Sequence, residues 1–194
     1  MTQALNIIKE FDIFLEQEVI TNGIELCNEA GLQFQLGLFL KLKYPDIKIE
    51  FERNINSIGI NKTKGVYHKS VVDILIDQKI AIEIKFPTKG AYPKRTYQAI
   101  QDVCFLEILK KEKNIEGYAI FITPLFLFFD NSKKSDGIYK YLRKEKRIYK
   151  VDKCDVKPFM SKGLKELDIC DSYPFELREL TNNNIKYYYY IIKI

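Results

Sequence analysis

The chain has 194 residues, which suits a single folded domain over residues 1–194. Hydrophobic residues make up 46% and aromatic residues 13% of the sequence, so the chain can bury a substantial core and an intrinsically disordered protein is excluded. The formal net charge of +5 leans only mildly toward polyanionic partners and does not by itself indicate one.

Cysteine and histidine usage excludes several classes of active site. The four cysteines form no C-x-x-C pair and the only histidine is His68, so we expect no zinc cluster of Cys and His ligands. Motifs for a nucleotide phosphate loop and for a nucleophilic serine, such as G-x-S-x-G, are absent. Carboxylates and lysines remain in quantity, and carboxylate oxygens are the ligands that a hard divalent metal prefers.

The sequence also indicates a compartment. Isolated cysteines in a Lys-rich chain are typical of a reducing cytoplasm. The N-terminal stretch MTQALNIIKEFDIFLEQEV carries acidic residues among its apolar ones, which is not the pattern of a signal peptide. No run of about 18 apolar residues occurs, so we expect no membrane span and a cytoplasmic protein.

Periodic patterns predict the elements in chain order. Apolar residues at helical spacing predict helices over residues 2–20 and 24–43. Alternating apolar and polar residues in IKIEFERNI predict a strand, and residues 70–86 predict two further strands joined by a turn near Gln78. A helix over about residues 94–112 follows, then the apolar strand EGYAIFIT and, at the end, the strand IKYYYYIIKI.

The order of these elements indicates the fold class. It runs helix, strand, strand, strand, helix, strand, and the helix between the third and fourth strands suits a parallel crossover. We therefore expect an α/β fold with a central mixed β-sheet flanked by helices.

The segment SVVDILIDQKIAIEIKF, residues 70–86, places charged residues in two otherwise apolar strands. Because side chains alternate along a strand, Glu83 and Lys85 share one face, opposite a purely apolar one. A three-residue turn centred on Gln78 would set Asp73 opposite Glu83, with Cβ atoms about 5 Å apart. A two-residue turn would separate the two acids. The three-residue turn lacks the glycine it prefers, and its support is chemical, because only this register gathers the polar residues.

Two facing carboxylates destabilise a sheet unless something balances their charge. A divalent cation between Asp73 and Glu83 would do so, and Lys85 beside it could neutralise a phosphate or orient a water molecule. This arrangement suits metal-assisted hydrolysis of a phosphodiester. The alternative is an exposed cross-strand salt bridge, which contributes only about 0 to 1 kcal/mol to stability.

The pattern of Asp73, nine intervening residues and then Glu83-Ile84-Lys85 resembles that of the PD-(D/E)XK nuclease superfamily, whose fold is restriction-endonuclease-like. The resemblance covers about residues 24–123, which leaves residues 124–194 as a C-terminal extension. It implies an αβββαβ core, with Asp73 and Glu83 binding Mg²⁺ (or Mn²⁺ in its place) and Lys85 beside the attacking water. The sequence departs from the pattern before Asp73, where Val72 stands in place of proline.

The resemblance also implies residues on the two flanking helices. Members often carry a glutamate on the first helix as a further metal ligand, and the candidates are Glu25 and Glu29. We favour Glu29, because Gln33 one helical turn later gives it a polar neighbour on the same side. Many members also carry a glutamine on the helix after the E-x-K strand, where Gln98 and Gln101 are both candidates.

The expected function is that of a Mg²⁺-dependent DNA endonuclease of restriction or defence type, acting on double-stranded DNA. Cutting both strands would favour a symmetric homodimer. Candidate substrate contacts are His68 and, in the basic run KYLRKEKRIYK, Arg143, Lys144 and Arg147, because phosphate contacts dominate nucleic-acid affinity. The alternatives are a non-catalytic nucleic-acid-binding or assembly module on the same fold and an RNA-directed or repair nuclease.

Overall fold

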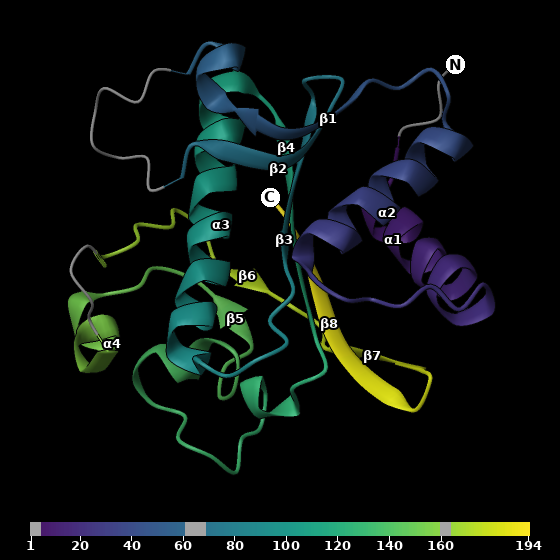
Figure 1. Ribbon diagram of the computed structural model, residues 1–194. Coiled ribbons are helices and arrows are strands. Elements are labelled where there is room, and N and C mark those ends of the chain that lie inside the picture. Colours follow the sequence, from purple (N-terminus) through teal and green to yellow (C-terminus); the bar gives the residue numbers. More distant parts are fainter. Residues whose placement is uncertain (1–4, 61–68, 160–163) are drawn as a thin grey trace.

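The computed structural model describes residues 5–60, 69–159 and 164–194 (Figure 1). His68 therefore lies outside the described residues. The strands are β1 (Ile49–Asn54), β2 (Val71–Ile76), β3 (Ile80–Lys85), β4 (Glu116–Thr123), β5 (Arg147–Ile148), β6 (Tyr173–Pro174), β7 (Arg178–Asn182) and β8 (Ile185–Lys193). The α-helices are α1 (Ile7–Phe14), α2 (Glu29–Lys43), α3 (Tyr92–Lys113) and α4 (Lys153–Val156). A π-helix, η1 (Leu15–Thr21), continues α1, and the short 3₁₀ helices are η2 (Ile55–Ile58), η3 (Phe126–Phe128), η4 (Gly137–Tyr141) and η5 (Lys157–Phe159).

The described residues form a six-stranded mixed sheet in the order β1-β2-β3-β4-β8-β7. Strands β1, β2 and β3 form an antiparallel meander, and β4 lies parallel to β3 because α3 crosses over between them. Strands β8 and β7 extend the sheet with antiparallel pairing. The expected α/β class with a mixed sheet is confirmed.

The turn between β2 and β3 has three residues, as the chemical argument predicted. Ile76 pairs with Ile80 across the hairpin. No glycine is present, and Asp77 and Gln78 both adopt left-handed backbone conformations, with φ angles of 50° and 56°. Aspartate tolerates this conformation, and here its carboxylate also accepts a hydrogen bond of 2.8 Å from the backbone N–H of Lys48. The neighbouring strand therefore helps to hold a turn that lacks its preferred residue.

The second helix begins later than predicted, at Glu29 rather than near residue 24. Asn28 caps it, because the side-chain oxygen of Asn28 accepts a hydrogen bond of 2.8 Å from the backbone N–H of Gly31. Glu25 consequently lies in the connection before the helix. The two candidate glutamates are thus distinguished, and only Glu29 is helical.

Both faces of the sheet are covered (Figure 1). Helices α1 and α2 pack on one face, where Phe11, Leu36 and Ile82 belong to the same buried cluster. Helix α3 and the C-terminal elements cover the other face. Residues 124–194 therefore help to build the fold, because they supply two strands of the sheet and much of the second core.

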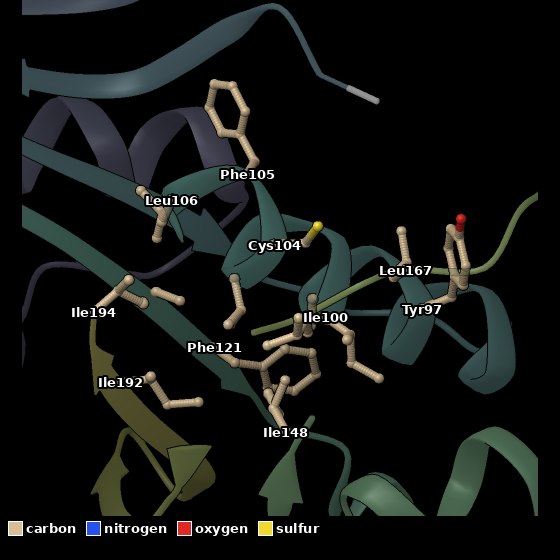
Figure 2. Close-up of a cluster of buried hydrophobic side chains, with 14 of the residues drawn as sticks. Tyr97, Ile100, Cys104, Phe105, Leu106, Phe121, Ile148, Leu167, Ile192 and Ile194 are labelled. Carbon is tan, nitrogen blue, oxygen red and sulfur yellow. The ribbon is translucent and has the colours of Figure 1, made fainter. Parts of the chain in front are cut away.

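Figure 2 shows that second core, with α3 lying over the sheet. Side chains from α3, such as Ile100, meet Phe121 of β4 and Ile192 of β8. Ile148 of β5 and Leu167 belong to the same cluster, and both are fully buried. This packing fixes the position of α3 over β4 and β3, and β3 carries Glu83 and Lys85.

Candidate active site

Asp73 and Glu83 lie on neighbouring strands and are both buried. The register that pairs Ile74 with Ile82 sets Asp73 opposite Glu83 one step further along. Only 4% of Asp73 and 0% of Glu83 is exposed, so the alternative of an exposed salt bridge is excluded. Asp73 Oδ2 also accepts a hydrogen bond of 2.8 Å from the backbone N–H of Ile84, which fixes this carboxylate against β3.

Lys69, just before β2, directs its ammonium group between three carboxylates. Its Nζ atom lies 3.2 Å from Asp73 Oδ1 and 3.3 Å from Asp102 Oδ1, and it is hydrogen-bonded to Glu83 Oε2. Asp102 comes from α3 and is also buried. The structure therefore adds a third buried acid and an internal cation to the pair of acids expected from the sequence.

Lys85 joins a fourth carboxylate to this group. Its Nζ atom lies 3.1 Å from Glu29 Oε1 and 3.2 Å from Asp102 Oδ2, with Asp73 Oδ2 at 4.0 Å. Glu29 Oε2 in turn accepts a hydrogen bond of 3.2 Å from the backbone N–H of Phe86. The N-terminus of α2 thereby reaches the end of β3, so that Glu29, Asp73, Glu83 and Lys85 come together. We refer to these four residues with Lys69 and Asp102 as the carboxylate–lysine cluster.

Burial is the largest influence on the pKa values of the cluster. It raises the pKa of Glu83 well above 4.5, and the nearby charge of Asp73 raises it further, while Lys69 opposes the shift. Burial also raises the pKa of Asp102, against the opposing charges of Lys85 and Lys69. For both lysines burial alone would lower the pKa, yet the surrounding carboxylates, with Asp102 the largest contributor, raise it. Both lysines are therefore charged, whereas burial disfavours the charged forms of Glu83 and Asp102.

The cluster fits a hard divalent cation by charge and by donor type. Its four carboxylates against two ammonium groups leave a formal charge of −2 when all are ionised. Glu83 Oε1 is buried and accepts no hydrogen bond from the described residues. Carboxylate oxygens suit Mg²⁺, which usually takes one or two of them and keeps several waters. Asp73 and Glu83 could therefore hold such an ion with water completing its coordination.

The carboxylates are not already spaced as a metal cage. Among the described residues, no group of three or more His, Cys, Asp or Glu side chains is arranged to hold an ion. The ammonium group of Lys69 lies among the acids and contacts three of them. A cation bound between Asp73 and Glu83 would therefore require this side chain to move, and a long lysine side chain can do so.

The two candidate glutamines lie on α3, the helix that carries Asp102. Gln98 accepts a hydrogen bond of 3.1 Å from Arg95 on the exposed part of the helix, and Gln101 is half-buried. In the described part of the chain, the hydrogen bonds and ion pairs from α3 to the cluster come from Asp102. Whether either glutamine contacts substrate stays a prediction.

The basic segment contains one buried and two exposed candidates. Arg143 is buried, and its guanidinium donates hydrogen bonds to two backbone carbonyl groups, which commits it to holding the surrounding loops. Lys144 is exposed, and so is Arg147, which donates a hydrogen bond of 3.4 Å to Ser172. Of the candidate cations, Lys144 and Arg147 are therefore the ones that the surface presents to a ligand.

Sequence reasoning missed Lys69 and Asp102, although each left a signal. Lys69 lies four residues before Asp73, so strand alternation would have placed both side chains on the same face. Asp102 lies three residues after Ala99 and four before Leu106, on the buried face of its helix. A buried acid at such a position needs a partner, and the lysines of the cluster supply it.

A scan against protein-family models, a search of curated proteins and a search of solved structures each found no match to this chain. Within the described residues, no helix is long and apolar enough to cross a membrane. The case for a function therefore rests on the residues of this chain alone.

Proposed function

We propose that this protein is a metal-dependent nuclease with a restriction-endonuclease-like fold, and specifically a Mg²⁺-dependent DNA endonuclease. The observation that carries the proposal is the pair of facing, buried acids, Asp73 and Glu83, beside Lys85. Burying these charges is costly, and a structural role alone gives no reason for an excess of acids over cations in the cluster. The choice of double-stranded DNA and of a restriction or defence role rests on the resemblance in sequence.

In this proposal each residue has a defined role. Asp73 and Glu83 hold Mg²⁺, with Glu29 assisting from α2. The bound ion polarises a phosphoryl oxygen and lowers the pKa of a bound water. Lys85 orients the attacking water and stabilises the negative charge that develops on the phosphate. Asp102, whose Oδ2 lies 3.2 Å from Lys85 Nζ, positions the Lys85 ammonium.

Lys69 acts as an internal counter-ion of the acids. It neutralises part of the charge of Asp73, Glu83 and Asp102, which keeps the acids together without an ion. When the site is loaded, its ammonium group leaves the acids and becomes available to a phosphate oxygen of the substrate. In this proposal the same side chain neutralises the acids and contacts the substrate.

Cleavage of supercoiled plasmid tests the proposal, with Mg²⁺ or Mn²⁺ compared with EDTA. Wild-type protein should nick or linearise the plasmid only with metal, and Lys85→Ala should lower the rate by roughly 100-fold or more, as for loss of a group that stabilises transition-state charge. Lys79→Ala is the matched control, because Lys79 is exposed in the turn at the other end of β3. Activity that survives in EDTA, or an equal loss in both variants, would contradict the assignment.

One observation favours a second candidate, a non-catalytic nucleic-acid-binding module. The ion pairs of Lys69 already balance part of the charge of the acids without metal. A binding module predicts stoichiometric DNA binding that is unchanged by EDTA and by Asp73→Ala. If neither cleavage nor binding of duplex DNA occurs, the same assays on RNA and single strands distinguish an RNA-directed nuclease.

A further inference from the structure

The outer face of α2 exposes large apolar side chains that the fold does not use. Phe34 is 58% exposed, Leu38 42% and Leu42 75%, and these residues lie four apart on one side of the helix. Phe51 of the edge strand β1 is 41% exposed, and its ring centroid lies 6.4 Å from that of Phe34. We call these four residues the α2 patch.

The patch also lacks charge. Residues 30–40, AGLQFQLGLFL, carry no ionisable side chain, although the outer face of this helix is solvent-exposed. Surface helices normally place charged residues on the face that they show to water. Depletion of charge at an apolar centre is instead the composition of a protein interface.

A groove borders the patch on its other side, between α2 and the N-terminal segment. It has a volume of about 490 Å³. Its lining consists of the apolar Ile24, Leu38, Phe39 and Leu42 and the polar or charged Gln17, Glu18, Gln35 and Lys43. An apolar ridge and a groove with apolar side chains in its lining therefore lie next to each other on one surface. A surface that carries both a protruding and a receiving part can complement a copy of itself.

We propose that the α2 patch is the contact surface of a symmetric homodimer. With the two-fold axis near Leu38, the two α2 helices pack antiparallel, so that Phe34 of one copy faces Leu42 of the other. The protruding side chains of each copy then enter the groove of its partner.

The exposed apolar area of the α2 patch is consistent with a second copy of the chain as its partner. The patch presents on the order of 400 Å² of apolar surface, taking roughly 150–250 Å² for a fully exposed large side chain. A standard interface buries about 800 Å² per partner, of which roughly 60% is apolar. The patch with the walls of its groove therefore supplies about the apolar area that one side of a stable dimer needs.

Sedimentation equilibrium without DNA and in EDTA tests the inference separately from any nuclease activity. Over roughly 1 to 100 µM, a range that detects micromolar dimers, wild-type protein should sediment with twice the mass of the chain. Leu38→Glu and Leu38→Lys should each raise the dissociation constant about 100-fold or more, because each would bury two like charges at the axis. A one-to-one mixture of the two variants should recover the dimer, since opposite charges then face each other.

Matched variants keep the test decisive. Ile185→Glu is the control, because Ile185 is a similarly exposed apolar residue on β8, and it should leave the dimer intact. Leu42→Glu, at the most exposed position, is a second disruptive variant that cannot perturb the core. Circular dichroism checks that each variant is folded.

A monomeric wild type, or folded Leu38→Glu protein that associates as tightly as wild type, would overturn the inference. Monomeric protein that binds anionic vesicles through the patch would also overturn it and reassign the surface to a membrane.

Discussion

At the scale of single residues, the cluster contains more acid than its lysines balance. The pKa of Glu83 is raised first by burial and then by Asp73, so its charged form is disfavoured in the folded state. Lys69 opposes this shift but contacts Asp73 and Asp102 as well, so its charge is shared. Such a site is expected to reduce stability in exchange for the capacity to bind a cation.

This excess of acid predicts a pH-dependent cost in stability. The pKa of Glu83 in the folded state lies above 4.5. The stability that protonated Glu83 contributes to the fold is therefore fully present below about pH 4.5 and is lost as the pH rises through the folded pKa. In EDTA, Glu83→Gln should therefore become more stable relative to wild type as the pH rises above about 4.5, because wild type then has to bury a charged carboxylate that the variant lacks. Urea denaturation at several pH values measures the free energy of unfolding of wild type and variant and its dependence on pH.

The same variant separates stability from binding. Mg²⁺ should stabilise the wild type, because a ligand that binds only the folded state raises its free energy of unfolding, and it should stabilise Glu83→Gln much less. Glu179→Gln is the control, since Glu179 pairs with Lys186 on the exposed surface. A Glu83→Gln protein that is less stable than wild type at neutral pH would mean that the ion pair with Lys69 outweighs the burial of charge.

At the scale of elements, the ends of helices and strands bring the cluster together. Glu29 is the first residue of α2, and its carboxylate reaches both the Lys85 ammonium and the backbone N–H of Phe86. Its position depends on where the helix starts, and Asn28 sets that start through the N-cap hydrogen bond. A local capping interaction therefore contributes to the geometry of the candidate active site.

This dependence can be tested with two helix caps of the same kind. Asn28→Ala should lower the free energy of unfolding by about 1 kcal/mol, the usual value of an N-cap, and should also weaken Mg²⁺ binding and cleavage because Glu29 loses its fixed position. Asn6 caps α1 in the same way, through a hydrogen bond of 3.2 Å from the backbone N–H of Lys9. Asn6→Ala should lose similar stability and leave metal binding unchanged. Equal effects of the two variants on Mg²⁺ binding, measured by calorimetry, would argue against the role of the cap.

At the scale of the whole molecule, the mixed sheet and the register of the β2–β3 hairpin followed from patterns in the sequence, whereas the strand order of the sheet and the long-range contacts of the cluster did not. Strand alternation and the chemistry of Asp73 and Glu83 were enough to select the turn between β2 and β3. The predicted second helix begins too early, at residue 24, because apolar periodicity continues before Asn28. In the structure the side chain of Asn28 caps the helix and so sets its start. Strand alternation places Lys69 on the same face as Asp73, but its contacts with Glu83 and Asp102 depend on packing between segments distant in sequence, which local patterns do not encode.

The C-terminal extension, residues 124–194, also takes its place in the fold through long-range contacts that sequence patterns do not predict. The predicted terminal strand is β8, but its place beside β4 depends on contacts between segments distant in sequence. Tyr190 on this strand is buried, and its ring stacks on Phe121 at 5.4 Å between centroids and on Phe175 at 4.2 Å. A residue of the extension thus connects the sheet to the segment that covers it, so the predicted division at residue 123 does not correspond to a break in the packing.

Removing this ring should therefore destabilise the whole molecule. Tyr190→Ala would leave a cavity between Phe121 and Phe175, and truncation of a buried aromatic residue typically costs about 3–5 kcal/mol. Tyr188→Ala is the matched control, because Tyr188 is on the same strand and face but only half-buried, so it should cost clearly less. If residues 124–194 are part of one cooperative unit, near-ultraviolet and far-ultraviolet circular dichroism should lose signal in a single urea transition for both variants. Two separate transitions in Tyr190→Ala, with the β3–β4 part surviving, would show that the extension folds independently of the sheet.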